Sequence, residues 1–152
     1  MSSRIAVFPG SFDPITLGHQ SLVMRAMPMF DKIIVAVGTN TSKNYLFDEP
    51  KRIEMVKQTF KEFPNIEATS YIGLTVDYCH QIGAQFILRG LRNSNDFEYE
   101  RAIADMNQAL YPQIETVFLI TQPQYSSISS TIVREIIKSQ GNAVQFLPKG
   151  IL

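Results

Sequence analysis

A stretch near the start of the chain, residues 5–19, combines residue types that suit the binding of an anion. It begins with an apolar run of strand type, passes through a loop with two prolines and a glycine, and enters a helical pattern at Thr16-Leu17-Gly18-His19. A helix N-terminus favours anions, because its free backbone N–H groups and the positive end of the helix dipole point the same way. His19 would add a titratable donor in the first turn, so we predict a phosphate site here.

Gly18 supports this interpretation, because glycine in a helical turn is less favourable than alanine by about 1 kcal/mol. It becomes useful where another group must approach the backbone closely. The alternative is a solvent-exposed His19 at a helix start, next to a glycine without functional meaning. The succession of strand, loop and helix favours the functional interpretation.

Other side chains that suit phosphate follow the later apolar runs. In chain order, these are Ser11 and Thr16 after the first run, Ser42 and Lys43 after the second, Arg89 and Arg92 after the fourth, and the serine-rich residues 126–131 after the fifth. The carboxyl ends of parallel strands meet at one edge of a sheet, so these groups would converge there. The sequence thus predicts a phosphate-handling cleft.

Several of these candidates also have a purely structural interpretation. Arg89 and Arg92 could instead form ion pairs with Asp96 or Glu100. Lys43 alone resembles a solvated surface lysine, and the serine cluster suits helix capping. An anion at that helix start would use the same groups as a cap, so capping and binding are compatible.

Three further polar or sulfur-containing residues indicate structure more than chemistry. Asp13 stands beside Pro14 and is typical of an Asx turn. Cys79 and His80 are neighbours without further ligands at zinc spacing, so a role in packing is favoured over a metal site.

Apolar periodicity predicts the secondary structure. Strands are expected at residues 4–8, 32–38, 65–71, 84–88 and 116–120. Helices are expected from about 16 to a break at Pro28, from 48 to about 63, and from 74 to 81 with a stop at Gly83. A fourth helix would be capped by Asp96 and carry Phe97, Ile103, Met106 and Leu110 on one face. A fifth would be capped by Ser129 or Ser130 and direct Ile132, Val133, Ile136 and Ile137 inward, with Gly141 past its end.

This order of elements indicates an α/β fold, a Rossmann-like, doubly wound, five-stranded parallel sheet with helices on both faces. We predict a single domain over residues 1–152, because no repeat, linker or low-complexity tract interrupts the pattern. Such sheets bind ligands at the carboxyl ends of their strands, near a topological switch point. The side chains predicted to bind phosphate lie in the loops that follow these strand ends.

The composition narrows the class of function. The 14 basic and 14 acidic residues cancel and no basic run occurs, which argues against nucleic-acid and membrane-surface partners. No apolar stretch is long enough to span a membrane, and the first residues leave no room for a signal peptide. The single cysteine cannot form an internal disulfide, which is typical of a reducing compartment. We therefore predict a cytoplasmic protein.

Residues 9–19, with the sequence PGSFDPITLGH, resemble the signature of the nucleotidyltransferase superfamily, which ends in its T/H-x-G-H motif. Further segments resemble the bacterial phosphopantetheine adenylyltransferase family: RGLR at 89–92, DFEYE at 96–100, SISST at 127–131 and VRE at 133–135. The likeness extends over nearly the whole chain, in order and at the family's spacing. It implies transfer of AMP from ATP to 4′-phosphopantetheine, which gives dephospho-coenzyme A and pyrophosphate.

The resemblance also implies roles for individual residues. The catalytic residues would be His19, as a transition-state stabiliser, with Thr16, Lys43 and Arg92. The ATP-binding residues would be Ser11, Phe12, His19, Gly90, Leu91, Arg92, Glu100, Tyr125, Ser126, Ser127, Ile128, Ser129, Ser130 and Thr131. The acceptor-binding residues would be Ser11, Lys43, Thr75 and Arg89. No residue is expected to hold a metal on its own, because Mg²⁺ would arrive with ATP.

A mechanism follows from the implied substrates. The acceptor phosphate is largely ionised near neutral pH, so the reaction needs positioning and charge stabilisation and no general base. His19 would donate to the α-phosphate, while Lys43 and Arg89 would hold the two reacting groups together. Arg92 and the start of the last helix would bind the β- and γ-phosphates. The resemblance further implies a homohexamer and coenzyme A as an additional ligand or inhibitor.

Two other functions stay open at this point. One is another small nucleotidyltransferase, acting for example on nicotinamide mononucleotide or glycerol phosphate. The RGLR segment argues against it. The other is a non-catalytic nucleotide-binding regulator on the same fold, and the presence of both His19 and Lys43 argues against that.

Overall fold

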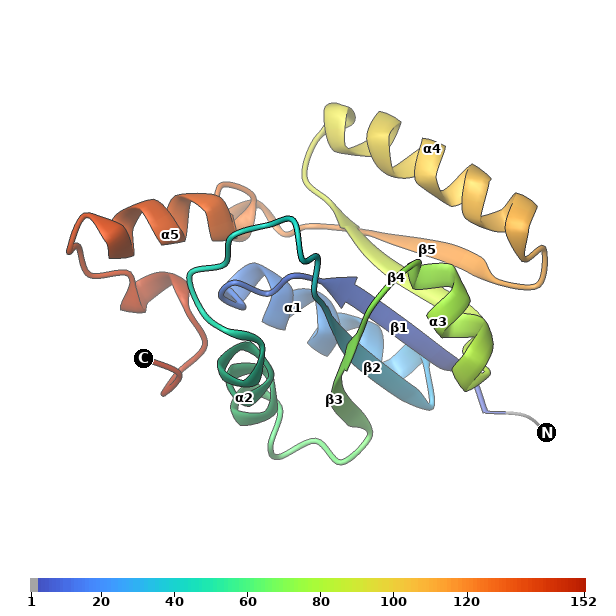
Figure 1. Ribbon diagram of the computed structural model, residues 1–152, viewed down its shortest axis with the longest axis horizontal. Coiled ribbons are helices and arrows are strands. Elements are labelled where there is room, and N and C mark those ends of the chain that lie inside the picture. Colours follow the sequence, from blue (N-terminus) through green and yellow to red (C-terminus); the bar gives the residue numbers. More distant parts are fainter. Residues whose placement is uncertain (1–2) are drawn as a thin grey trace.

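The computed structural model describes residues 3–152 and contains a parallel sheet flanked by helices (Figure 1). The strands are β1 (Ile5–Gly10), β2 (Lys32–Gly38), β3 (Ile66–Tyr71), β4 (Phe86–Leu91) and β5 (Glu115–Ile120). The helices are α1 (Leu17–Ala26), α2 (Glu49–Thr59), α3 (Thr75–Ile82), α4 (Ser94–Leu110) and α5 (Ser130–Lys138), with 3₁₀ turns at Met27–Met29, Pro123–Tyr125 and Val144–Phe146. The strand order is β3-β2-β1-β4-β5 and every pair is parallel, which confirms the predicted α/β, Rossmann-like, doubly wound sheet.

Alternate side chains of the central strands point to opposite faces of the sheet and build two hydrophobic clusters. In β1, Ala6 and Phe8 belong to the cluster that also includes side chains of α1, α2 and α5. Val7 belongs to the smaller cluster on the α3 side. Both faces of the central strands are therefore covered, which is why these strands read as continuous apolar runs.

The strands β1 and β4 separate toward their carboxyl ends. Among the described residues they pair at two positions, Ala6 with Phe86 and Val7 with Ile87, although both strands continue beyond these pairs. The chain also changes direction across the sheet here, because β2 and β3 lie on one side of β1 and β4 and β5 on the other. This is the topological switch point, where doubly wound sheets bind their ligands.

The strand β4 extends further than predicted. The prediction ended this strand at Leu88 and placed Arg89 and Gly90 in the following loop. Both residues lie within β4, where they are in register with Phe118 and Leu119 of β5. Pairing with a neighbouring strand overrides the weak strand preference of glycine. Arg89 is consequently held by the sheet and not by a loop.

Two helix ends also differ from the prediction. The helix α2 is capped by Asp48, as expected, but ends at Thr59 instead of near Phe63. The chain turns over the next residues, and Pro64 disfavours a helical conformation at the residue before it. The helix α4 is capped by Asn93, whose Oδ1 accepts a hydrogen bond of 2.9 Å from the backbone N–H of Asp96. Asp96 itself was wrongly predicted as the cap.

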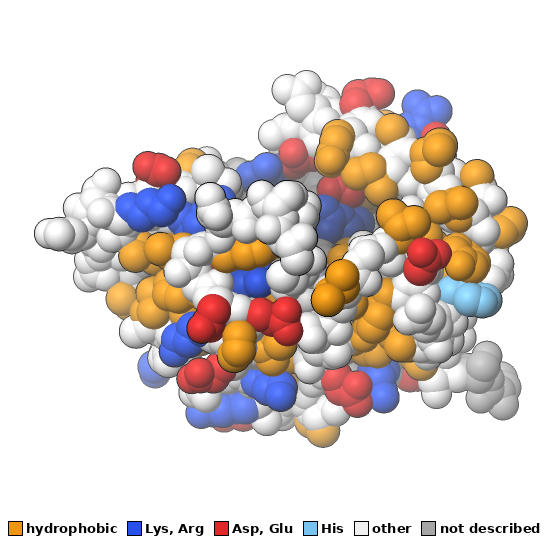
Figure 2. Space-filling view, viewed as in Figure 1, with side chains coloured by type: hydrophobic (Ala, Val, Ile, Leu, Met, Phe, Trp, Pro, Cys, Tyr) orange, Lys and Arg blue, Asp and Glu red, His pale blue; other side chains and the backbone are white. Residues whose placement is uncertain are grey.

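Apolar residues on α4 share a face, but that face is open to solvent. Phe97, Ile103, Met106 and Leu110 are 40%, 40%, 68% and 56% exposed. Hydrophobic side chains, drawn in orange, gather over this helix in Figure 2. The sequence predicted this apolar stripe of four residues on α4, and the monomer leaves the stripe largely exposed.

The inward face of α5 contains fewer residues than predicted. Val133 is buried, and Ile136 and Ile137 pack against the core. Ile132 is 55% exposed, so its predicted inward position is wrong. Around the helix axis, Ile136 and Ile137 lie within about 60° of Val133, whereas Ile132 lies about 100° away and so falls outside the inward face.

Three observations bear on the predicted compartment. Within residues 3–152, no helix has the length and apolarity required to cross a membrane. Cys79 is a buried free cysteine, and burial raises the pKa of its thiol to about 12. Met1 and Ser2, which form part of the segment predicted to lack a signal peptide, lie outside the described residues.

Candidate active site

Two adjoining pockets open at the switch point. The first, named here the Lys43 pocket, has a volume of about 320 Å³ and is lined by the loops after β1 and β2, by β4 and by α4. The second, the His19 pocket, has a volume of about 280 Å³ and is lined by the β1–α1 turn, β4 and the start of α5. Pro9, Gly10, Arg89 and Glu100 line both pockets, so they form the boundary between them. Figure 2 shows Lys and Arg side chains in the hollow beside α4.

The predicted site residues divide between these two pockets. The Lys43 pocket contains the whole predicted acceptor set, Ser11, Lys43, Thr75 and Arg89. The His19 pocket contains Thr16, His19, Gly90, Arg92, Glu100, Tyr125, Ile128, Ser129 and Ser130. Five residues predicted to bind ATP line neither pocket: Phe12, Leu91, Ser126, Ser127 and Thr131.

Of these five residues, Phe12 and Leu91 are buried, whereas Ser127 and Thr131 are exposed. Phe12 is 3% exposed, and its ring packs edge-on against the His19 ring with the centroids 5.0 Å apart. The hydroxyl of Ser126 donates to the Pro123 carbonyl. Phe12 therefore supports His19 from behind, and none of the five side chains lines either pocket.

The His19 side chain is held by a reciprocal cap at the start of α1. Its Nδ1 accepts a hydrogen bond of 3.0 Å from the backbone N–H of Thr16, and the Thr16 hydroxyl accepts one of 3.4 Å from the His19 backbone N–H. An amide N–H can only donate, so Nδ1 is the acceptor and the proton of the neutral ring resides on Nε2. The T-x-G-H sequence is thus a capping box in which histidine replaces the usual glutamate.

The electrostatic environment keeps this ring neutral. Burial, followed by the positive charges of Arg89 and Arg92, lowers the pKa of His19 from 6.5 to about 4. The ring is partly accessible and lines the His19 pocket. At neutral pH, the His19 ring is therefore neutral and presents its Nε2–H as a hydrogen-bond donor.

Gly18 and Gly90, two of the glycines that line the His19 pocket, have different surroundings. A Cβ at Gly90 would collide with Leu22 Cδ1 of α1, so a side chain at this position would force the buried Leu22 side chain to move. A Cβ at Gly18 would lie 3.5 Å from Thr16 Oγ1 and 3.8 Å from Tyr125 Cβ, which are ordinary contacts. The protein itself would accept a methyl group at Gly18. The packing of the protein therefore does not account for the glycine, and the close approach of a bound group stays a prediction.

Arg89 crosses the gap where β1 and β4 separate. Its Nε and Nη2 donate to the Glu100 carboxylate at 3.0 and 2.6 Å, and its Nη1 donates to the Pro9 carbonyl at 2.7 Å. Glu100 is 8% exposed, so this pair is partly buried. The ion pair that the sequence left as an alternative therefore exists. Arg89 still has two N–H groups beyond these three bonds, and it lines both pockets.

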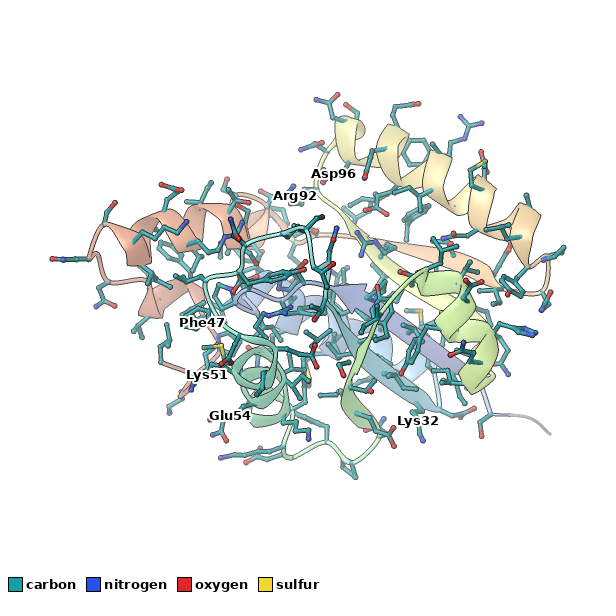
Figure 3. The ribbon with its side chains drawn as sticks, in the orientation of Figure 1. Lys32, Phe47, Lys51, Glu54, Arg92 and Asp96 are labelled. Atoms are coloured by element: carbon teal, nitrogen blue, oxygen red, sulfur yellow. The ribbon has the colours of Figure 1, made fainter. Side chains whose placement is uncertain are left out.

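Arg92 forms the second anticipated ion pair. Its Nε lies 3.1 Å from Asp96 Oδ2, and its backbone N–H donates to the same oxygen at 2.9 Å. Figure 3 shows the two side chains together at the start of α4. Hydrogen bonds and the charge of Arg92 keep the pKa of Asp96 below its usual value, against the effect of burial. Arg92 thus reaches the His19 pocket with part of its charge already neutralised.

The start of α5 closes the far side of the His19 pocket. Ser129 is the N-cap, and its hydroxyl accepts a hydrogen bond of 3.2 Å from the Ile132 backbone N–H. The Ser130 hydroxyl donates to the Pro14 carbonyl at 2.8 Å, which connects α5 to the β1–α1 turn. Ser129 therefore both caps α5 and lines the pocket, so the two interpretations of the serine cluster are compatible, as predicted.

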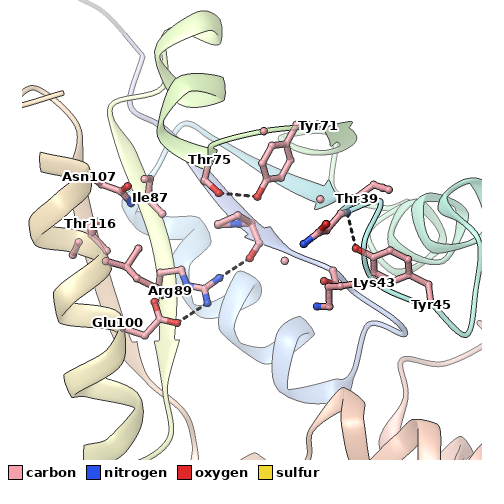
Figure 4. Close-up of a pocket in the computed structure, with 18 residues that line it drawn as sticks. Thr39, Lys43, Tyr45, Tyr71, Thr75, Ile87, Arg89, Glu100, Asn107 and Thr116 are labelled. Carbon is pink, nitrogen blue, oxygen red and sulfur yellow. Dashed lines mark hydrogen bonds and ion pairs between the residues drawn. The ribbon is translucent and has the colours of Figure 1, made fainter. Parts of the chain in front are cut away.

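The Lys43 pocket combines a cation with hydroxyl groups. Lys43 lies in the loop before α2, with its Nζ 5.9 Å from the centre of the Tyr45 ring. On the opposite side of the pocket, the Tyr71 and Thr75 hydroxyls are 2.7 Å apart (Figure 4). Burial raises the pKa of the Tyr71 phenol, so it remains neutral. The pocket can therefore bind a phosphate at one end and hydrogen-bond an uncharged chain at the other.

Asp13 was wrongly predicted as an Asx-turn residue. It is 2% exposed, and its two carboxylate oxygens accept hydrogen bonds of 2.8 Å from the backbone N–H groups of Leu46 and Phe47. Its own carbonyl accepts a bond of 2.9 Å from Arg134. Asp13 consequently ties the β1–α1 turn to the loop before α2 and to α5.

Sequence reasoning missed the role of Arg52, which is 1% exposed in α2. Its guanidinium contacts three backbone carbonyls and one hydroxyl, those of Phe47, Ser11, Gly38 and Thr39. The signal was present in the helix periodicity. Arg52 precedes the buried Met55 and Val56 by three and four residues, which places a charge on the apolar face of α2.

Comparison with known proteins agrees with this geometry. Residues 7–136 match the cytidylyltransferase-like family. Proteins named phosphopantetheine adenylyltransferase are 49% identical in Flavobacterium psychrophilum and 47% identical in Bacteroides thetaiotaomicron, each over 97% of both chains. One from Leuconostoc mesenteroides is 49% identical over 97% of this chain and 91% of its own.

Solved structures extend the comparison at the level of the fold. A structure from Vibrio parahaemolyticus, described as a nicotinate-nucleotide adenylyltransferase, has a TM-score of 0.75 at 18% identity over 99% of this chain and 96% of its own. A bifunctional NMN adenylyltransferase/ADP ribose pyrophosphatase from Francisella tularensis also has a TM-score of 0.75, at 13% identity over 97% of this chain and 46% of its own. These structures show the fold, and the family match together with the curated relatives defines the class, a nucleotidyltransferase. The chain belongs to the cytidylyltransferase-like family and, within it, to the phosphopantetheine adenylyltransferases.

Proposed function

We infer that the protein is an adenylyltransferase that moves AMP from ATP to 4′-phosphopantetheine, giving dephospho-coenzyme A and pyrophosphate in coenzyme A synthesis. The observation that carries this inference is the junction of the two pockets at Arg89, in a chain about half identical to proteins of that name. One pocket suits the nucleotide and the other the acceptor. Their common boundary is where an acceptor phosphate could meet the α-phosphate of ATP.

We propose that the His19 pocket binds ATP. Its phosphate donors would be the Nε2–H of His19, the side chain of Arg92 and the backbone N–H groups at the start of α5. Gly18 would allow a phosphate to approach the first turn of α1 closely. The neutral state of His19 suits a donor to the α-phosphate, because it can hydrogen-bond charge that accumulates there during transfer.

We propose that the Lys43 pocket binds 4′-phosphopantetheine. The acceptor phosphate would lie near Lys43, Ser11 and the free N–H groups of Arg89, at the end nearer the His19 pocket. The uncharged pantetheine arm would extend between Tyr71, Thr75 and α4. An ionised phosphate monoester needs no base to attack the α-phosphate, so the residues act by positioning and by charge stabilisation.

Mg²⁺ is proposed to arrive with ATP, where it would offset the charge of the phosphates. Magnesium sites of this kind use phosphate oxygens with one or two carboxylates or none. Within residues 3–152, no group of three His, Cys, Asp or Glu side chains is arranged to hold a metal. The carboxylates of the His19 pocket, Asp96 and Glu100, each pair with an arginine. This donor set fits an ion held mainly by the nucleotide.

We also propose a homohexamer in the cytoplasm. The exposed stripe of α4, together with Ile120, which is 68% exposed at the end of β5, supports burial against other subunits. The buried free cysteine and the use of ATP support a reducing compartment.

Coenzyme A combines a phosphopantetheine arm with an adenine nucleotide and is proposed as an inhibitor that occupies both pockets. Light scattering after gel filtration measures the oligomer directly.

The decisive experiment measures dephospho-coenzyme A formation from ATP, Mg²⁺ and 4′-phosphopantetheine. Parallel reactions contain nicotinamide mononucleotide, nicotinate mononucleotide or glycerol phosphate as the acceptor, and pyrophosphate release is recorded for each. We expect turnover with 4′-phosphopantetheine only. Faster turnover with another acceptor would reassign the substrate, and ATP binding without any turnover would indicate a regulator.

A further inference from the structure

The positively charged side chains of the two pockets differ in whether a carboxylate neutralises them. Of the arginines, Arg89 is paired with Glu100, and Arg92 with Asp96. The acceptor phosphate carries up to two negative charges at neutral pH and must approach the triphosphate of ATP. Among the residues that line the Lys43 pocket, Lys43 is the cation that no ion pair within residues 3–152 neutralises.

A second unneutralised cation, Arg52, lies directly behind this pocket. Its Nη1 donates to the carbonyls of Ser11 at 2.8 Å and Gly38 at 3.1 Å, and its Nη2 donates to the Thr39 hydroxyl at 3.2 Å. Ser11, Gly38 and Thr39 all line the Lys43 pocket. The Arg52 guanidinium also lies 3.9 Å from the centre of the Tyr45 ring, another pocket residue. Arg52 therefore contacts the pocket wall from inside the protein.

The partners of Arg52 are unusual for a buried charge. A buried guanidinium is normally paired with a carboxylate, because removal from water is costly. Within residues 3–152, no carboxylate forms an ion pair with Arg52. Arg52 is linked to the Glu49 carboxylate only through the Thr39 hydroxyl, which accepts from Arg52 and donates to Glu49 at 2.7 Å. The carboxylate of Asp13 faces the N–H groups of Leu46 and Phe47.

We propose that Arg52 is a positioning residue for the phosphate of the acceptor substrate. It joins the loop after β1, the end of β2 and the loop before α2, and these segments carry Ser11, Thr39 and Lys43. Its charge is directed at the back of the same pocket wall, where it favours a bound anion. Arg52 does not touch the substrate, and it acts through the groups that do. This proposal rests on the proposed function, which assigns 4′-phosphopantetheine to this pocket.

The test compares the binding of 4′-phosphopantetheine and of pantetheine, which lacks the phosphate, by calorimetry with the full chain. The wild type should bind the phosphorylated ligand more tightly, and the ratio of the two dissociation constants measures the contribution of the phosphate. In Arg52→Met we expect this ratio to fall at least tenfold, while the dissociation constant of ATP changes less than twofold. A role in packing alone would weaken both pantetheine ligands equally.

Matched variants separate charge, geometry and folding. Arg25→Met is the control, because Arg25 is an exposed arginine that also donates to a backbone carbonyl, that of Ile120, outside both pockets. It should keep the wild-type ratio. Arg52→Lys keeps the charge but loses most of the four contacts, and it should lower the ratio at least threefold. This variant also serves as the test should Arg52→Met fail to fold.

An unchanged ratio in Arg52→Met or Arg52→Lys would overturn the proposal, as would an equal loss for both ligands. A wild-type protein that binds no 4′-phosphopantetheine and forms no dephospho-coenzyme A would instead overturn the proposed function, and this inference with it. Wild-type activity combined with an unchanged ratio would remove only the role of Arg52.

Discussion

The two pockets lie side by side but are built in different ways. In the His19 pocket the two helix caps are local, since Thr16 and His19, and Ser129 and Ile132, are each three residues apart, and the bond from Ser130 to Pro14 holds the two helix starts together. In the Lys43 pocket they join distant segments. Arg52 lies 41 residues from Ser11, and at the boundary that both pockets share, Arg89 lies 80 residues from Pro9. One pocket is a product of helix starts, and the other is a product of the assembled sheet.

This difference indicates how each pocket should respond to mutation. A local site keeps its geometry as long as its helix forms, so a change of side chain should affect chemistry more than shape. A site assembled from distant loops depends on the bonds that join them. Three predictions test the comparison, in order of decreasing effect, and a fourth concerns pH.

The largest effect is expected for His19→Ala. Loss of one well-placed donor in an active site typically lowers the rate about 10²–10³-fold. We expect kcat to fall by about this factor, while loss of the capping bond to Thr16 destabilises the protein by about 1 kcal/mol. Steady-state kinetics and a denaturant titration measure the two quantities. Turnover near that of the wild type would remove His19 from catalysis.

Lys43→Ala should act on the other pocket. A hydrogen bond to a charged group contributes about 1.5–3 kcal/mol, so we expect kcat/KM for 4′-phosphopantetheine to fall about 10- to 100-fold. The dissociation constant of ATP, measured without the acceptor, should change less than twofold. Weaker ATP binding with unchanged use of the acceptor would assign Lys43 to the nucleotide instead.

The two glycines should behave in opposite ways. Gly18→Ala should leave the fold intact or stabilise it by up to about 1 kcal/mol, because alanine is the better helix residue. It should nevertheless weaken ATP binding, since a methyl group would occupy the space reserved for a phosphate. Gly90→Ala should destabilise the protein by about 1–3 kcal/mol, because it overpacks the contact with Leu22.

Thermal melts and ATP titrations of both glycine variants test this contrast. A Gly18→Ala variant that binds ATP as well as the wild type would contradict the close approach of a ligand. A Gly90→Ala variant with unchanged stability would contradict the packing explanation.

The last prediction, which stands outside this order, concerns the pH dependence of stability in the ATP-free protein. The pKa of His19 is lowered from 6.5 to about 4 by burial and by Arg89 and Arg92, so the unfolded chain binds more protons between these values. The contribution of His19 to stability is therefore complete above pH 6.5 and is lost as the pH falls toward 4. Urea titrations at several pH values should show a smaller decrease in this window for His19→Asn than for the wild type. Equal slopes would contradict the lowered pKa.

Much of the molecule could be predicted from the order of its patterns. The apolar runs of β1 and β2 indicated strands buried on both faces, and the alternation with helices indicated the parallel sheet. The Gly83 stop is also confirmed, with the residue in the left-handed conformation that glycine favours. Such features depend on neighbours in the sequence, so the sequence contains them.

The errors arose where distant segments decide the outcome. Arg89 was placed in a loop, because arginine followed by glycine is a poor strand signal and pairing with β5 could not be anticipated. Asp13 was read as a local turn residue, although its acceptors are used by N–H groups more than 30 residues away. Arg52 was passed over, since its four partners come from three separate segments.

The sequence by itself determined the class of fold, the strand, turn and helix succession that carries His19, and the cap at the start of α5. These are properties of short segments, governed by backbone hydrogen bonding and by hydrophobic periodicity. Only the tertiary structure decided how the site is divided into two pockets. It decided which arginines are neutralised by carboxylates and which positive charge lies behind the pocket wall. Those properties depend on distances between residues far apart in the chain, and folding alone sets them.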